Sequence, residues 1–237
     1  MGAAYKIRAS AVVLLAVLLA ACAGRPVREA PPAPTPAPQA ISREGRAFAV
    51  VSRESLLTVL VYRGGPLAKA GHNHVVASHT LTGVAYAPPE VTGASFEMRV
   101  PVNELVIDEA DLRTLEGPDF PPDVPESARE GTRRNLLGTA LLDGEHYPEI
   151  LLQSERIERT AEGAQAQVRV TVRDQVRSVT VPLHYEMTGD ELRVSGEFPL
   201  KQTDLGLTPF SLLGGALRVE DGIQVRFRVV ARAAEGQ

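Results

Sequence analysis

Apolar and polar residues alternate along much of the chain. In residues 167–173 every second position is a valine, and the positions between them carry Gln, Arg or Thr. A similar period of two recurs in residues 96–102, 179–187, 192–200 and 223–229. In a β-strand this period directs one set of side chains towards a core and the other towards water. We therefore expect these stretches to form half-buried strands.

Short segments that contain Gly, Pro or Asp separate the predicted strands. They occupy residues 64–66, 88–89, 161–163, 173–175 and 188–190. Strands joined by such short turns pair antiparallel. A further apolar face at residues 57–61 brings the number of strands to about eight, which is typical of a sandwich or a barrel. The pattern predicts an all-β domain, and we favour an antiparallel β-barrel.

Residues 116–142 interrupt the alternation. Ser127 and Glu130 have the spacing of a capping box, and several apolar residues after them fall on one helical face. That face consists of Leu136, Leu137, Ala140 and Leu141. We expect one short helix at about residues 127–142, and an exposed loop at the proline-rich residues 116–125.

The first residues of the chain are typical of an export signal. Lys6 and Arg8 precede an apolar run at residues 11–20, which is shorter than the roughly 20 residues of a membrane-spanning helix. Cys22 follows Leu-Ala-Ala, as in the site at which a bacterial lipoprotein is cleaved and diacylated. We predict a lipoprotein signal peptide at residues 1–21 and lipidation of Cys22, in preference to a plain secretory signal.

The segment after the signal peptide predicts a tether. Residues 22–40 are rich in Pro and Ala, which favours a stiff, extended spacer. The acyl chains on Cys22 would supply the two or more lipid groups that stable anchoring requires. Ala23 stands where an Asp would retain a lipoprotein in the inner membrane. The expected location is therefore the periplasmic side of a bacterial membrane, namely the outer membrane, with a folded domain at residues 41–237.

The cysteine content excludes an internal disulfide, and the charge argues against a general attraction to nucleic acid. Cys22 is the only cysteine, so no internal disulfide can form and the core alone must hold the domain. Removal of the signal peptide takes away two basic residues and no acid, which moves the formal net charge from −4 to −6. A mildly acidic domain without a basic stripe has no general attraction to nucleic acid.

Four segments of the domain resemble one known family. They are residues 71–74 (Gly-His-Asn-His), 147–150 (Tyr-Pro-Glu-Ile), 170–182 and 203–207 (Thr-Asp-Leu-Gly-Leu). Their order and spacing are similar to those of the YceI-like family, which comprises exported, lipocalin-like, polyisoprenoid-binding proteins. The resemblance covers nearly all of the domain.

The resemblance implies an extended, lipocalin-like barrel that receives an isoprenoid, such as a quinone or a polyprenyl phosphate. The chain has Leu205 where the family commonly has an aromatic residue, and Leu-Leu-Asp-Gly at residues 141–144 in place of a Phe-rich turn. A barrel of eight strands is either filled by side chains or wide enough for one slender ligand, and the alternation is the same in both cases. The candidate pocket residues are His72, His74, Phe96, Met98, Val100, Val170, Leu183, Tyr185, Phe198 and Phe227.

The histidines of residues 71–79 allow three interpretations. On a strand, His72 and His74 project from one face and His79 from the other. A zinc site needs three or four converging ligands, so a metal site is the minority interpretation. The pair can instead bond to neighbouring polar groups at the barrel rim, or donate to the polar end of a ligand.

Other polar clusters have weaker functional signals. Arg133 and Arg134 are candidates for binding an anionic head group, since Arg presents a planar fork to phosphate; the alternative is the wet side of a helix. The carboxylates in residues 107–111 predict a solvated loop or a helix start, and Gly214 and Gly215 either a flexible lip or an ordinary loop. The chain has no nucleophile-elbow, zinc-protease or phosphate-loop motif, so we expect no enzyme, cofactor or metal.

The sequence thus predicts a lipid-anchored periplasmic protein that holds an isoprenoid or similar long apolar ligand, for carriage or sequestration. Its expected partners are that lipid or quinone and, through acylated Cys22, the membrane. Two alternatives remain open. One is a periplasmic metal-binding or stress-related module that uses His72 and His74, and the other is a structural lipoprotein with a filled core.

Overall fold

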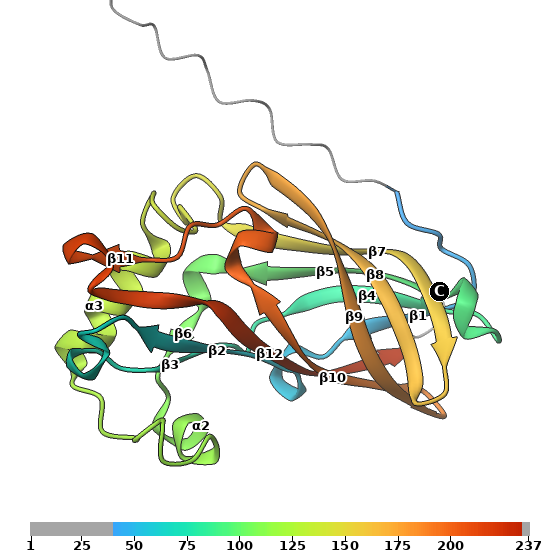
Figure 1. Cartoon of the computed structure of the whole chain (residues 1–237). Coiled ribbons are helices and arrows are strands. Elements are labelled where there is room, and N and C mark those ends of the chain that lie inside the picture. The colour runs from blue at the N-terminus through green and yellow to red at the C-terminus, as the bar shows by residue number, and fades with distance from the viewer. Residues whose placement is uncertain (1–39, 234–237) are drawn as a thin grey trace, which may run out of the picture. The chain divides into compact units, whose positions relative to one another are not determined.

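The computed structural model describes residues 40–233 of the chain. The predicted signal peptide, Cys22 and the tether up to Gln39 lie outside the described residues. Within residues 40–233, no helix is long and apolar enough to cross a membrane. The described part is nearly all β (Figure 1), as the alternation of the sequence predicts.

Residues 40–233 form twelve strands, with two α-helices and six short 3-10 helices between them. The strands are β1 (Arg46–Val50), β2 (Leu56–Gly64), β3 (His74–Ser78), β4 (Thr82–Ala87), β5 (Ser95–Pro101), β6 (Val106–Ile107), β7 (Glu149–Thr160), β8 (Gly163–Val172), β9 (Gln175–Thr188), β10 (Glu191–Lys201), β11 (Ser211–Leu212) and β12 (Leu217–Ala233). The α-helices are α2 (Ala110–Leu115) and α3 (Glu126–Leu137). The 3-10 helices are η1 (Ser52–Glu54), η2 (Ala68–Ala70), η3 (Val91–Gly93), η4 (Val102–Glu104), η5 (Gln202–Leu205) and η6 (Leu213–Gly215).

Eight strands close into a barrel. Their order is β1-β4-β5-β7-β8-β9-β10-β12, and β12 pairs again with β1. Every pairing is antiparallel. The prediction of an extended antiparallel barrel of about eight strands is therefore confirmed.

The sheet also extends beyond the closed barrel. The first part of β12 pairs with β2, and the order then continues through β3 to β6. Helix α3 contacts β6. Three leucines at and after the end of α3, Leu136, Leu137 and Leu141, pack against the main hydrophobic core. This end of the barrel, which we call the helix end, is thus covered by apolar side chains.

Strands β9 and β10 pair over only five residues each, Glu191–Ser195 with His184–Thr188. The carbonyl oxygen of Pro182 points towards β10. This follows from its distance to Gly196 of that strand, where an added Cβ would lie only 2.4 Å from the oxygen. In an antiparallel strand the N–H of a residue points to the same side as its C=O, so Pro182 lacks the donor that the next ladder bond needs. Beyond this proline the two strands diverge, and η5 contacts both of them (Figure 1).

Three details of the helical region differ from the prediction. Helix α3 begins after Pro125 without a side-chain cap, so Ser127 and Glu130 do not form a capping box. The helix ends at Leu137, and Ala140 and Leu141 follow it. The proline-rich loop is not wholly exposed, because Phe120 and Val124 are only 3% and 7% exposed.

The structure also distinguishes between the alternatives considered for residues 107–111 and for Gly214 and Gly215. Residues 107–111 include the start of α2, as one interpretation held, but Asp108 is buried rather than solvated. Gly214 and Gly215 both have positive φ, near 66° and 94°, and belong to η6. A tight 3-10 turn therefore occupies the position for which we considered a flexible lip or an ordinary loop.

Candidate functional site: an apolar barrel cavity

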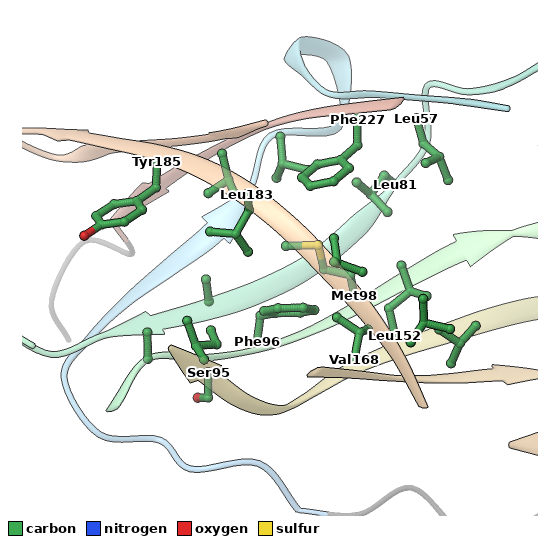
Figure 2. Close-up of a pocket in the computed structure, with 18 of the residues that line it drawn as sticks. Leu57, Leu81, Ser95, Phe96, Met98, Leu152, Val168, Leu183, Tyr185 and Phe227 are labelled. Carbon is green, nitrogen blue, oxygen red and sulfur yellow. The ribbon is translucent and has the colours of Figure 1, made fainter. Parts of the chain in front are cut away.

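The inward side chains of the barrel line a cavity of about 300 Å³. Figure 2 shows part of its wall, in which Phe96 and Met98 of β5 face Val168 of β8, Leu183 of β9 and Phe227 of β12. A cavity of 150 Å³ lined by similar residues is large enough for benzene. The cavity therefore favours the hollow barrel over the filled core.

The predicted apolar pocket residues all lie in the cavity wall. They are Phe96, Met98, Val100, Val170, Leu183, Tyr185, Phe198 and Phe227. Sequence reasoning missed wall residues on several further elements, among them Leu57 and Val59 of β2 and Ile150 and Leu152 of β7. The alternation at residues 57–61 could have revealed the two β2 residues. The β7 residues could not be found in this way, because that strand mixes apolar and charged residues without a clean period.

The width of the cavity depends on small residues beside large ones. On β8 the inward positions change from Ala164 and Ala166 at one end to three valines at the other. On β10 the inward position between two larger residues is Gly196. A Cβ there would lie 2.7 Å from the Phe227 ring and 2.4 Å from a backbone oxygen, so only glycine fits beneath that ring.

A buried polar network lies outside this wall and joins β3, α2 and α3. The ring Nδ1 of His74 lies 2.7 Å from the Asp108 carboxylate, and we assign the proton to Nδ1 because the carboxylate accepts. The second carboxylate oxygen accepts from Arg113 at 2.5 Å and from the backbone N–H of Val75 at 2.9 Å. Thr132 of α3 lies 3.3 Å from His74 Nε2. We call these residues the polar network.

Arg113 holds the proline-rich loop to this network. Its side chain is fully buried, and it donates to the backbone oxygens of Asn73 and Pro121 at 2.7 Å each. Its guanidinium carbon also lies 5.7 Å from the centre of the Phe120 ring, a cation–π distance. Arg113 therefore joins the loop to β3 through contacts that its own segment of sequence does not reveal.

Burial and hydrogen bonding act in opposite directions on Asp108. Burial raises the pKa of this carboxyl, but the hydrogen bonds from His74 and from the Val75 N–H outweigh it and leave the pKa below its ordinary value. Asp108 is thus a carboxylate at neutral pH. The buried charge is balanced by Arg113.

Thr132, His74 and Asp108 have the hydroxyl–imidazole–carboxylate connectivity of a hydrolase triad. None of the three lies in the cavity wall. Asp108 is also shared with a buried arginine, which suits a structural anchor. The arrangement fits the interpretation that His74 bonds to neighbouring polar groups.

The other histidines are separated from one another. The ring centres of His72 and His74 lie 6.3 Å apart. His72 precedes β3, which begins at His74, so the strand parity does not apply to it, and neither ring belongs to the cavity wall. His79 lies 2.7 Å from Glu109, and His146 lies 2.9 Å from Asp143 on a different segment. Within residues 40–233, no group of three or more His, Cys, Asp or Glu is placed to hold a metal ion.

The two arginines proposed for a head group lie on α3, and neither belongs to the cavity wall. Arg133 donates to the backbone oxygens of Leu105 and Asn103. Arg134 is mostly exposed and faces Glu130 at 4.0 Å. The geometry therefore agrees with the alternative, in which these residues form the wet side and the attachment of an amphipathic helix.

Comparisons with known proteins agree with this geometry. A family model described as the YceI-like domain matches residues 68–231. The crystal structure of Burkholderia cenocepacia BcnA is 16% identical, with a TM-score of 0.56, and the alignment covers 76% of this chain and 98% of that one. At this identity the likeness shows the fold alone. No curated protein matches the chain.

Two further solved structures are similar at lower scores. One is a polyisoprenoid-binding domain from Saccharophagus degradans implicated in plant cell wall breakdown, which is 11% identical with a TM-score of 0.49 and coverage of 80% and 99%. The other is the Campylobacter jejuni YCEI protein, which is 11% identical with a TM-score of 0.47 and coverage of 65% and 82%.

Proposed function

The chain belongs to the YceI-like family, and we propose that it binds an isoprenoid or a similar long apolar ligand, such as a quinone, inside its barrel. The observation that carries this proposal is the cavity of about 300 Å³, whose wall consists almost entirely of inward aliphatic and aromatic side chains. Its role is to carry or sequester the ligand.

The wall chemistry supports burial as the source of affinity. Each methylene that leaves water contributes about 0.8 kcal/mol, so a long prenyl chain gains affinity along its whole length. Such a chain has no polar group that would need a partner inside the barrel. The rigid strands also keep the cavity open before the ligand enters, which lowers the entropic cost of binding.

We further propose that the protein is anchored by acylated Cys22 on the periplasmic side of a bacterial membrane, namely the outer membrane. The support is in the sequence: the short basic and apolar signal, Leu-Ala-Ala before Cys22, Ala23 after it, and the Pro/Ala-rich tether. An anchored barrel would meet its lipid ligand where that ligand is concentrated.

Native mass spectrometry of the full chain purified from membranes, followed by organic extraction, tests the ligand. We expect a co-purifying prenyl lipid or quinone, and uptake of added geranylgeraniol once that lipid is removed. A protein that is recovered empty and takes up no geranylgeraniol would refute the proposal. For the anchor, Cys22→Ser should move the protein from the membrane fraction to the soluble fraction, and an unchanged distribution would contradict lipidation.

A further inference from the structure

Two loops at the helix end together form an exposed apolar tip. One loop follows β2 and contains η2, and the other runs from β11 through η6 into β12, at the same end of the molecule as α3 (Figure 1). The backbone N–H of Leu67 in the first loop donates to the backbone oxygen of Ala216 in the second at 2.8 Å. Leu67, Leu212 and Leu213 are 46%, 47% and 76% exposed. We call these three side chains the leucine tip.

The backbone of the second loop holds its leucine away from the rest of the protein. Leu213 has a positive φ of 51°, a conformation that is unfavourable for leucine. Gly214 and Gly215 follow it, and a Cβ added to either would meet no atom within 4 Å. The loop therefore projects into open space. Strained backbone of this kind is concentrated at functional sites, and its result here is an apolar side chain presented to the solvent.

The leucine tip is also set apart by its charge. Residues 64–72 and 205–217 contain no acid and one basic residue, Lys69, although Asp and Glu outnumber Lys and Arg by 29 to 25 in the whole chain. Lys69 is exposed and makes no ion pair or side-chain hydrogen bond within residues 40–233. Leu115 of α2 provides the contrast, since it is 78% exposed but has Asp111 and Glu116 within four residues. Exposed leucine and unpaired positive charge thus coincide at the tip.

We infer that the leucine tip inserts into the surface of a lipid bilayer that contains anionic lipids. An exposed apolar patch marks a contact with a protein or a membrane. A specific protein interface buries about 1,200 Å² or more, which is far more than three projecting side chains offer. Leucines that enter the bilayer interface leave water, and Lys69 is attracted to its negative surface. The contact directs the helix end of the barrel towards the membrane.

The chain that precedes the domain is long enough for this orientation. The first strand, β1, pairs with the last residues of β12, whereas the tip adjoins the first residues of β12. The 17 residues of β12 span roughly 56 Å at about 3.3 Å per residue. Residues 22–39 would reach about 56 Å in an extended conformation at about 3.1 Å per residue. The inference rests on the proposed membrane anchor, but not on the identity of the ligand.

A polarity-sensitive fluorophore on one introduced cysteine tests the contact. The full chain is purified from membranes and reconstituted into vesicles of phosphatidylethanolamine and phosphatidylglycerol that contain a nitroxide-labelled lipid. We expect the fluorophore at Leu213→Cys to shift to the blue and to be quenched about twofold or more. The same fluorophore at Leu115→Cys, on an equally exposed leucine, should stay unquenched. The natural chain, treated alike, corrects for any label on Cys22, the only natural cysteine.

Removal of the positive charge tests the preference for anionic lipid. Lys69→Gln in the labelled Leu213→Cys chain should lower the ratio of inserted to free tip about fivefold in the vesicles with phosphatidylglycerol. In vesicles of phosphatidylcholine alone the same substitution should change nothing. An equal effect in both kinds of vesicle, or no effect in either, would overturn the role of charge.

The outcomes separate the leucine tip from the anchor. Equal quenching of both labels, or of neither in protein that stays on the vesicles, would refute the tip and leave the anchor at Cys22 standing. Protein that does not stay with the vesicles would refute both. A blue shift that needs no vesicles and grows with protein concentration would assign the tip to a second copy of this chain, against the inference.

Discussion

The barrel cavity lies among the eight strands of the closed barrel, and the polar network lies beside it on β3, α2 and α3; the two regions are built in opposite ways. The cavity wall consists of side chains with few polar atoms, and empty space lies between them. The polar network contains a buried carboxylate and a fully buried arginine that bond to each other, to residues 73–75 and to the loop at Pro121. The first region should tolerate changes of side-chain size, and the second should tolerate no loss of a partner.

The largest expected effect follows from breaking the network. Arg113→Met keeps much of the side-chain volume but leaves the Asp108 carboxylate buried without its cation. Removal of one partner of a buried ion pair costs about 3–5 kcal/mol, so the urea midpoint of unfolding should fall sharply. Arg134→Met is the control, because its exposed pair with Glu130 is worth about 0–1 kcal/mol. Equal stability of the two variants would refute the anchoring role of Arg113.

Filling the cavity should have the opposite effect: folding stability should change little, and ligand affinity should fall. Val181 faces the cavity from β9, so the larger ring in Val181→Phe can occupy empty space. We expect folding stability to stay within about 1 kcal/mol, below the usual cost of overpacking a filled core, and geranylgeraniol affinity to fall about tenfold or more. Thr180→Phe, on the outer face of the same strand, is the matched control. A large loss of stability without a loss of binding would indicate a filled barrel.

The two regions also differ in how far the sequence predicts them. A period of two places each residue of a strand on one face, so Phe96, Leu183 and Phe227 could be assigned to the interior without knowledge of their neighbours. The network depends on contacts between residues as distant as His74 and Thr132, and on Asp108 at a positive φ of 58° after β6. No local pattern contains that information. The β-bulge in β7, which turns Arg159 towards the cavity, is unpredictable for the same reason.

Acid should weaken the network before it affects the cavity. The folded pKa of Asp108 lies below its unfolded value near 3.8, so the unfolded chain binds more protons in acid. The stability from Asp108 is present above pH 3.8 and is lost as the pH falls through the folded pKa. Urea unfolding from pH 7 down to the acid limit of folding should show a smaller loss for Asp108→Asn than for the natural chain. A parallel loss in both proteins would contradict this role of Asp108.

The smallest effect concerns two histidines whose pKa values shift in opposite directions. Burial, together with electrostatic interactions with His74 and Arg113, lowers the pKa of His72 at the edge of the network. The hydrogen bond and negative charge of Asp143 raise the pKa of exposed His146. NMR titration of the ring protons should therefore place His72 below 6.5 and His146 above it. Asp143→Asn should return His146 towards its ordinary value without moving His72, because only His146 contacts that carboxylate. If instead both rings titrate together, the side chain of His72 is solvated and the burial that lowers its pKa is contradicted.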